Sequence, residues 1–130
     1  MNAKVYNCPV EAAIDVIGGK WKPLILWWLQ QGTYRFAELR RMIPGITEKV
    51  LTQQLRELEA DGIVARQAYP TVPPKVEYSL TEYGGSLKLA LEAICDWGRG
   101  HMQRIGAHQI RPGSIPDDRT NVAKSAKRGS

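Results

Sequence analysis

Residues 44–62 have the sequence Pro-Gly-Ile-Thr-Glu-Lys-Val-Leu-Thr-Gln-Gln-Leu-Arg-Glu-Leu-Glu-Ala-Asp-Gly, and this stretch decides the fold. Pro44-Gly45 predicts a sharp turn. Thr47 is a favourable N-cap for the helix that follows, because its hydroxyl can accept a hydrogen bond from a free N–H of the first turn. We expect that helix to run to about Asp61, with Gly62 just beyond its end. The stretch therefore predicts a tight turn followed by a well-delimited helix.

The predicted helix has two chemically different sides. At about 100° per residue, Leu51, Leu55 and Leu58 share one side and can anchor the helix to a core. The opposite side consists of Lys49, Thr52, Gln53, Arg56 and the small Ala60. Arginine suits the edge of guanine, glutamine that of adenine, and threonine a phosphate or the thymine methyl group. The free N–H groups at the helix start suit a phosphate. This side is a candidate DNA-binding surface, although an ordinary solvated helix face has a similar composition.

The sequence on either side of this stretch predicts further helices and a β-hairpin. Apolar residues recur at helical spacing in several segments, and Gly or Pro separates the segments. We expect helices from Cys8-Pro9 to Ile17 and from about Trp21 to Gly32, an extended bridge at 34–36, a brief helix around Leu39, strands over 63–68 and 76–80, and a long final helix capped by Thr81. Three helices followed by a hairpin, the wing, are typical of a winged helix-turn-helix. The predicted fold is therefore mainly α with a small β-hairpin.

Composition and charge limit the class of protein. The chain has 130 residues and a net charge of +5, which fits one domain with a moderately basic surface. Residues 35–56 hold five cations against two carboxylates, which is the balance that a phosphate-contacting surface needs. Residues 107–130 have the same balance but no helical period. We therefore expect a domain over 1–106 and a flexible basic tail over 107–130.

The sequence gives no sign of catalysis, of a bound cofactor or of a membrane span. The two histidines are His101 and His108, and no group of His, Cys and carboxylates has metal-ligand spacing. Gly18-Gly19-Lys20 lacks the other residues of a phosphate-binding loop. No apolar run approaches the roughly 20 residues of a membrane helix, and two cysteines make no disulfide framework. We expect a cytoplasmic protein that is not an enzyme and holds neither a metal nor a cofactor.

The predicted DNA-binding set extends beyond the helix at 47–61. The short helix before it is basic, and the hairpin carries a cation beside its proline-rich tip. The complete set is Arg35, Arg40, Thr47, Lys49, Thr52, Gln53, Arg56 and Lys75. The stiff tip at 69–75 can lie along a groove or the backbone of a duplex, but a rigid surface turn is an equal alternative.

The final helix has more apolar surface than a small three-helix core can cover. Its stripe consists of Leu87, Ala90, Leu91, Ile94, Trp97 and His101. One DNA-contacting helix spans few base pairs, and proteins of this type usually place two such helices about one helical turn apart on the duplex. We therefore expect a homodimer with a two-fold contact between the first and last helices, through Val10, Ile14, Leu87, Leu91, Ile94 and Trp97. Packing within the chain is the alternative for any one of these side chains.

Several blocks of sequence over about residues 6–105 carry a family resemblance. They are Cys8-Pro9-Val10-Glu11, Gly18-Gly19-Lys20-Trp21-Lys22, Arg35-Phe36-x-x-Leu39, Pro44-Gly45-Ile46, residues 51–58, residues 72–81 and Cys95-Asp96-Trp97-Gly98. In these blocks, in order and without gaps, the chain resembles the HxlR family of winged-helix regulators. The resemblance implies a dimeric, MarR-like, DNA-binding repressor or activator of transcription. Some members of the family respond to electrophiles or oxidants.

Cys8 matches the N-terminal cysteine of that family, which is the sensing thiol in its redox-responsive members. A thiol at a helix N-cap meets the positive end of the helix dipole, which favours the thiolate, and Lys4 is close in sequence. Cys8 is therefore the redox-sensing candidate, with capping or packing as the alternative. We expect Cys95, which lies near the apolar stripe, to be structural.

The expected function is that of a homodimeric transcriptional regulator that binds a pseudo-palindromic operator in double-stranded DNA through the helix at 47–61. An oxidant or a small molecule is the expected effector. The four tryptophans either pack in the core or line a pocket for such a molecule. The alternative function is a winged helix used as a protein–protein interaction module without specific DNA binding. Such modules usually lose the cationic, amide-bearing face, whereas Lys49, Gln53 and Arg56 are present here.

Overall fold

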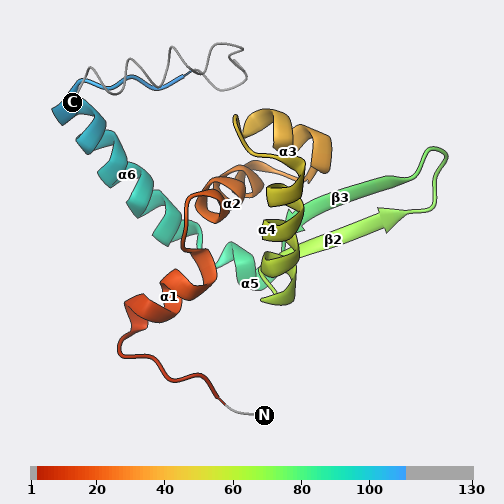
Figure 1. Ribbon diagram of the computed structural model, residues 1–130, viewed down its shortest axis with the longest axis horizontal. Helices are drawn as coiled ribbons and strands as arrows, with labels where there is room; N and C mark the ends of the chain where they lie inside the picture. Colours follow the sequence, from red (N-terminus) through yellow and green to blue (C-terminus); the bar gives the residue numbers. More distant parts are fainter. Residues whose placement is uncertain (1–2, 111–130) are drawn as a thin grey trace.

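The structure, a computed structural model, describes residues 3–110. Its elements are α1 (Pro9–Ile17), α2 (Trp21–Gln31), β1 (Tyr34–Arg35), α3 (Phe36–Met42), α4 (Glu48–Ala60), β2 (Val64–Tyr69), β3 (Lys75–Leu80), α5 (Glu82–Gly85) and α6 (Lys88–Ile105). The hairpin of β2 and β3 extends to one side of the body formed by α2, α3 and α4, while α1 and α6 lie on the opposite side (Figure 1). This arrangement is the expected winged helix-turn-helix. Most of the predicted tail, residues 111–130, lies outside the described residues.

The core forms where α2, α3 and α4 meet. On α2, Ile25, Leu26 and Leu29 are buried and form the centre of this core. The other buried apolar side chains are Ile17, Leu39, Ile43, Ile46, Leu51, Leu55, Leu58, Ile63, Val64 and Leu91. Each fully buried Leu or Ile contributes about 1.5–3 kcal/mol relative to its exposed state, so this cluster is the main support of the fold.

The wing belongs to a three-stranded antiparallel sheet with the strand order β1-β3-β2. Val64 pairs with Leu80 at the base of the hairpin and Tyr69 with Lys75 at its far end. The predicted strand over 63–68 is displaced by one residue, because the backbone of Ile63 is used in a loop: its N–H donates to Leu58 and its carbonyl accepts from Thr81. The predicted extended bridge is β1, and Tyr34 pairs with Tyr78 of β3. This third strand joins the start of α3 to the wing, and α4 packs directly on β2.

The prediction of one long final helix capped by Thr81 is wrong. Thr81 caps only the short α5, where its Oγ1 accepts from the N–H of Gly84 at 2.9 Å. The chain then makes a tight turn at Ser86 and Leu87 before α6 begins. The break coincides with the close approach of α5 to the body: a Cβ on Gly84 would lie 2.1 Å from the carbonyl oxygen of Ile63. This tertiary contact, together with the low helix propensity of two adjacent glycines, separates α5 from α6.

Within residues 3–110, no helix has the length and apolar character that a membrane crossing requires. The longest helix, α6, has 18 residues and carries polar side chains along its length.

Candidate nucleic-acid interface

The two predicted sides of α4 are confirmed as a buried side and a solvent side. Leu51, Leu55 and Leu58 are 1% exposed or less. Lys49, Gln53 and Arg56 are exposed. Because the leucines pack on the core at three points along the helix, α4 is held with its polar side outward.

The start of α4 is fixed by the turn and the cap that the sequence predicts. Gly45 has a φ of 91°, which an L side chain adopts only with strain, so glycine is required for this turn. The Oγ1 of Thr47 accepts a hydrogen bond from the N–H of Val50 at 3.1 Å. Glu48 and Lys49 of the first turn are exposed, and the start of a helix carries the positive end of its dipole, which favours a phosphate.

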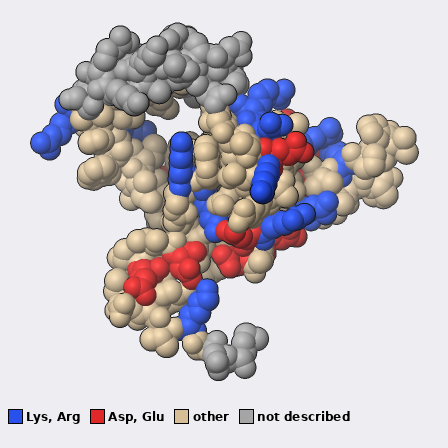
Figure 2. Space-filling view, in the orientation of Figure 1, with Lys and Arg blue, Asp and Glu red and all other residues tan. Residues whose placement is uncertain are grey.

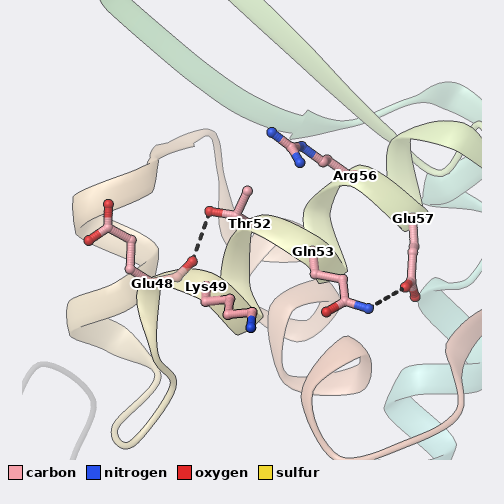
Figure 3. A pocket seen from close by; sticks show the side chains of 6 residues that line it. All are labelled: Glu48, Lys49, Thr52, Gln53, Arg56 and Glu57. Atoms are coloured by element: carbon pink, nitrogen blue, oxygen red, sulfur yellow. Dashed lines mark hydrogen bonds between the residues drawn. The ribbon is translucent and has the colours of Figure 1, made fainter.

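An open hollow of about 700 Å³ runs along the outer side of α4. It is lined by Glu48, Lys49, Thr52, Gln53, Arg56 and Glu57. Lys49, Gln53 and Glu57 leave the helix on one side of the hollow, and Thr52 and Arg56 on the other (Figure 3). The Thr52 hydroxyl donates to the Glu48 carbonyl at 2.8 Å, which leaves its methyl group and lone pairs for a ligand. The hollow therefore presents an ammonium, a carboxamide and a guanidinium to solvent.

Two of the predicted cations, Arg35 and Arg40, come from neighbouring elements. Arg35 lies on β1 at the start of α3, where its backbone N–H donates to Glu38 at 2.8 Å. Arg40 lies on α3, and its guanidinium is 3.7 Å from the carboxylate of Glu48. In Figure 2, basic and acidic side chains lie close together over α3 and α4. Both arginines are exposed, so β1 and α3 extend the basic surface of α4.

Lys75 is not grouped with the side chains of α4. Its ammonium lies 3.4 Å from Glu77 and 4.8 Å from the centre of the Tyr69 ring, so its charge is partly compensated within the wing. The tip of the wing points away from α4 (Figure 1), and the face of the tip shown in Figure 2 carries no charged side chain. Val72 at the tip is fully exposed.

The pair of Lys22 and Glu57 is a feature of the site that sequence analysis missed. Lys22 is the one charged side chain among residues 3–110 that is buried, and its ammonium lies 2.6 Å from Glu57. The hydrogen bond from Lys22, and then that from Gln53, hold the pKa of the Glu57 carboxyl below its ordinary value. A lysine within the otherwise apolar segment 21–29 was the available sequence signal. Its partner could not be inferred, because Glu57 is on a different helix.

Cys8, the redox-sensing candidate, is exposed at the N-cap of α1, and its side chain makes no capping hydrogen bond. Lys4, which is close to Cys8 in sequence, pairs with Asp15, and its ammonium lies 2.9 Å from that carboxylate. The Tyr6 hydroxyl donates to the same carboxylate at 2.5 Å. The hydrogen bonds from Tyr6 and then from Lys4 lower the pKa of Asp15. These contacts tie the segment that precedes Cys8 to α1.

Cys95 is half-buried on α6 beside Arg99. The Arg99 guanidinium donates to the Cys95 sulfur at 3.5 Å and to Asp96 at 2.7 Å. The hydrogen bond to Asp96 and the charge interaction with Cys95 raise the pKa of Arg99. Cys95 therefore takes part in a local polar cluster on α6.

The residues predicted for a two-fold contact differ widely in exposure. Leu91 is only 4% exposed and packs in the core of its own chain, so it has little surface left for a partner. Leu87 is half-buried against the core. The other four side chains are exposed: Val10 is 64%, Ile14 60%, Ile94 55% and Trp97 73% exposed. Trp97 also stacks on His101, with the ring centres 5.3 Å apart.

The fold and the outward cations of α4 define a winged helix-turn-helix of the class that binds DNA. The family model described as HxlR-like helix-turn-helix matches residues 16–106. The chain therefore belongs to the HxlR family of helix-turn-helix transcriptional regulators. The family consists of regulators, which are not enzymes, and residues 3–110 contain no group of three or more His, Cys, Asp or Glu that could hold a metal.

Relatives and solved structures support this assignment over most of the chain. The chain is 56% identical over 105 residues to the uncharacterized HTH-type transcriptional regulator YtcD of Bacillus subtilis, a match that covers 81% of this chain and 83% of YtcD. Two structures of the redox regulator HypR are also similar. Its oxidized form gives a TM-score of 0.69 at 55% identity over 72% of this chain and 96% of HypR. Its reduced form gives a TM-score of 0.72 at 50% identity over 76% of this chain and 98% of HypR.

Proposed function

We propose that this regulator is a homodimer that binds a pseudo-palindromic operator in duplex DNA by placing the outer side of α4 in the major groove. The observation that carries the proposal is the orientation of α4, whose leucines are fully buried while Lys49, Gln53 and Arg56 face solvent. These are the donors that contact guanine and adenine edges in the major groove. Thr47 at the helix start and Arg35 and Arg40 beside it supply contacts to phosphates.

The homodimer is supported by the apolar side chains that the single chain leaves uncovered on α1 and α6. Val10, Ile14, Ile94 and Trp97 are each more than half exposed, and both helices lie on the side of the molecule opposite the wing (Figure 1). Contiguous exposed apolar surface marks an interaction site, and we propose that these side chains form one when two copies associate. A contact between two copies through these helices would cover them and leave both α4 helices free to bind one duplex.

Cys8 is proposed as the thiol through which an oxidant or electrophile acts on the regulator. It is exposed, and it directly precedes the α1 positions Val10 and Ile14 of the proposed contact. The similarity to HypR, a redox regulator, favours this role. Oxidation or alkylation of Cys8 would alter the contact between the two copies and hence the spacing of the two α4 helices.

The remaining proposals concern the residue range of the DNA-binding unit and the location of the protein in the cell. We assign the DNA-binding and dimer-forming unit to residues 1–106, with 107–130 as a basic tail. The cytoplasm is the proposed location, since DNA is the partner. A protein–protein interaction module without specific DNA binding is not favoured, because the outer side of α4 keeps its cations and its carboxamide exposed.

The salt dependence of DNA binding tests the main proposal. Lys49→Ala and Arg56→Ala should each weaken duplex binding, and Arg40→Ala, which removes a proposed phosphate contact, should reduce the slope of log K against log salt by about 0.9. Arg104→Ala removes an exposed cation from the last turn of α6 and serves as the matched control, with no change expected. Unchanged binding by both α4 variants, with intact folding and assembly, would show that another face contacts DNA.

The sensing role is tested separately by Cys8→Ser. The parent should lose or change operator binding when treated with diamide or a quinone, whereas Cys8→Ser should bind as the untreated parent does, with or without the reagent. Cys95→Ser is the control, because Cys95 is half-buried beside Arg99. A response of Cys8→Ser equal to that of the parent would exclude Cys8 as the sensor.

A further inference from the structure

The pair of Lys22 and Glu57 needs an explanation other than stability. The Lys22 side chain is 11% exposed, and its ammonium lies 2.6 Å from Oε1 of Glu57. Removing a charge from water costs several kcal/mol, and an ion pair at such a site often gains no stability over an apolar side chain of similar size. A methionine would fill the position of Lys22 without that cost. Stability alone therefore does not explain the lysine at this position.

Glu57 connects the buried lysine to the DNA-facing side of α4. Its Oε1 is bound by Lys22, and its Oε2 accepts a hydrogen bond from Nε2 of Gln53 at 3.3 Å (Figure 3). A carboxylate with a lowered pKa is ionised near neutral pH and can only accept hydrogen bonds, so the amide nitrogen of Gln53 must face it. This contact selects one rotation of the Gln53 carboxamide. Its carbonyl oxygen and its second N–H are then left for a ligand.

We propose that Lys22 and Glu57 are positioning residues for sequence recognition, in which Lys22 anchors Glu57 and Glu57 orients the Gln53 carboxamide toward an adenine. The oxygen and the second N–H of Gln53 match the N6 donor and the N7 acceptor of adenine in the major groove. Lys22 also neutralises a carboxylate that would otherwise face the phosphates. This inference rests on the proposed placement of α4 in the major groove and adds a determinant of which base pair is preferred.

The test uses a charge-neutral double variant of the full chain, Lys22→Met/Glu57→Gln, which removes one cation and one anion. Duplexes selected from a randomised library with the parent and with Gln53→Ala identify the A·T pair whose preference depends on Gln53. The measured quantity is the ratio of affinities for the selected duplex and for the same duplex with that pair changed to G·C. Lys4→Met/Asp15→Asn is the matched control, since it removes an ion pair of 2.9 Å between the segment before α1 and α1, with the same change of charge.

The double variant should lower this ratio by about fivefold or more, which lies within the range expected for one lost bidentate base contact. Its affinity for non-specific DNA and its salt slope should equal those of the parent, because net charge and phosphate contacts are unchanged. In the Gln53→Ala background the same double substitution should have no further effect on the ratio. The control variant Lys4→Met/Asp15→Asn should have the same affinity ratio, non-specific affinity and salt slope as the parent.

Three results would overturn the inference. One is an unchanged ratio in the double variant with a parent-like thermal midpoint. Another is an equal loss of affinity for all duplexes, which indicates a structural role. The third is a further, additive loss in the Gln53→Ala background. If Lys22→Met/Glu57→Gln unfolds, Glu57→Gln alone is tested against the same criteria. A parent without salt-dependent duplex binding would overturn the proposed function as well as this inference.

Discussion

α4 and α6 are both amphipathic helices, but only α4 has its apolar side covered by its own chain. Leu51, Leu55 and Leu58 of α4 are 1% exposed or less. On α6, Leu91 is buried, whereas Ile94 and Trp97, one and two turns further along the same stripe, are mostly exposed. The three-helix core therefore accepts the whole apolar side of α4 and only the beginning of that of α6.

This difference indicates where each helix interacts with something outside the chain. Burial of its leucines holds α4 in one orientation, so its polar side is the side available to a ligand. On α6, an apolar surface is available instead, and α1 adds Val10 and Ile14 beyond the core. An uncovered apolar surface fits a second copy of the chain, and an exposed cationic side fits DNA.

The largest expected effect follows from truncating the buried side of α4. Leu55→Ala should lower the free energy of unfolding by about 2–5 kcal/mol, because it removes methyl groups from a packed core. Ile94→Ala, at a side chain that is more than half exposed, is the matched control on α6 and should cost less than about 1 kcal/mol at low protein concentration. Urea denaturation followed by tryptophan fluorescence measures both. Equal losses would mean that the apolar sides of α4 and α6 are equally buried.

The second effect concerns association of two copies. Trp97→Glu should raise the dissociation constant of the dimer by at least about 30-fold, since loss of a central aromatic contact typically costs 2 kcal/mol or more. Gln103→Glu introduces the same charge at an exposed position on the opposite side of α6 and should leave the constant unchanged. Gel filtration with light scattering gives the mass at each concentration. A parent that is monomeric at micromolar concentration would contradict the proposed contact.

A smaller effect is expected at the start of α4. Thr47→Ala removes the hydroxyl that accepts from Val50 and should lower the free energy of unfolding by about 1 kcal/mol. Thr71→Ala also removes a hydroxyl with a local hydrogen bond, to Pro73 in the wing tip, but it caps no helix. It should change stability by less than about 0.5 kcal/mol. Thermal unfolding compares the two variants, and a larger loss from Thr71→Ala would exclude the capping role of Thr47.

The smallest expected effect is a dependence of stability on pH. The pKa of Glu57 in the folded chain is lowered from its ordinary value of 4.5, mainly by Lys22. Its contribution to stability is therefore present above pH 4.5 and is lost as the pH falls through the lowered folded pKa. Thermal midpoints between neutral pH and pH 3 should fall more for the parent than for Glu57→Gln. Parallel curves for the two proteins would mean that the ion pair does not form in solution.

Local patterns in the sequence were sufficient for the helix-turn-helix but not for the contacts between distant segments. The start and end of α4 follow from Thr47 and Gly62, and its orientation follows from the spacing of its leucines. The break between α5 and α6 depends on the approach of Gly84 to Ile63, which no local pattern records. The pairing of Lys22 with Glu57 likewise joins two helices that are far apart in sequence.

The apolar stripe of α6 shows a different reason for incomplete prediction. Periodicity identifies Leu91, Ile94 and Trp97 as one side of a helix, but it does not tell how far the core of the same chain extends along that side. Only the packed structure separates Leu91, which is buried, from Ile94 and Trp97, which are not. The DNA-binding residues and the contact between copies therefore stay predictions for the experiments above.

Hydroxyl-radical footprinting on a duplex selected by the parent chain, combined with the stoichiometry of the complex, tests the central account most directly. The account predicts two chains per duplex and two symmetric protected regions whose centres lie about 10 base pairs, or a multiple of that, apart. It also predicts that Trp97→Glu weakens protection of both regions together, because two copies bind as a unit. A single protected region occupied by one chain would contradict it.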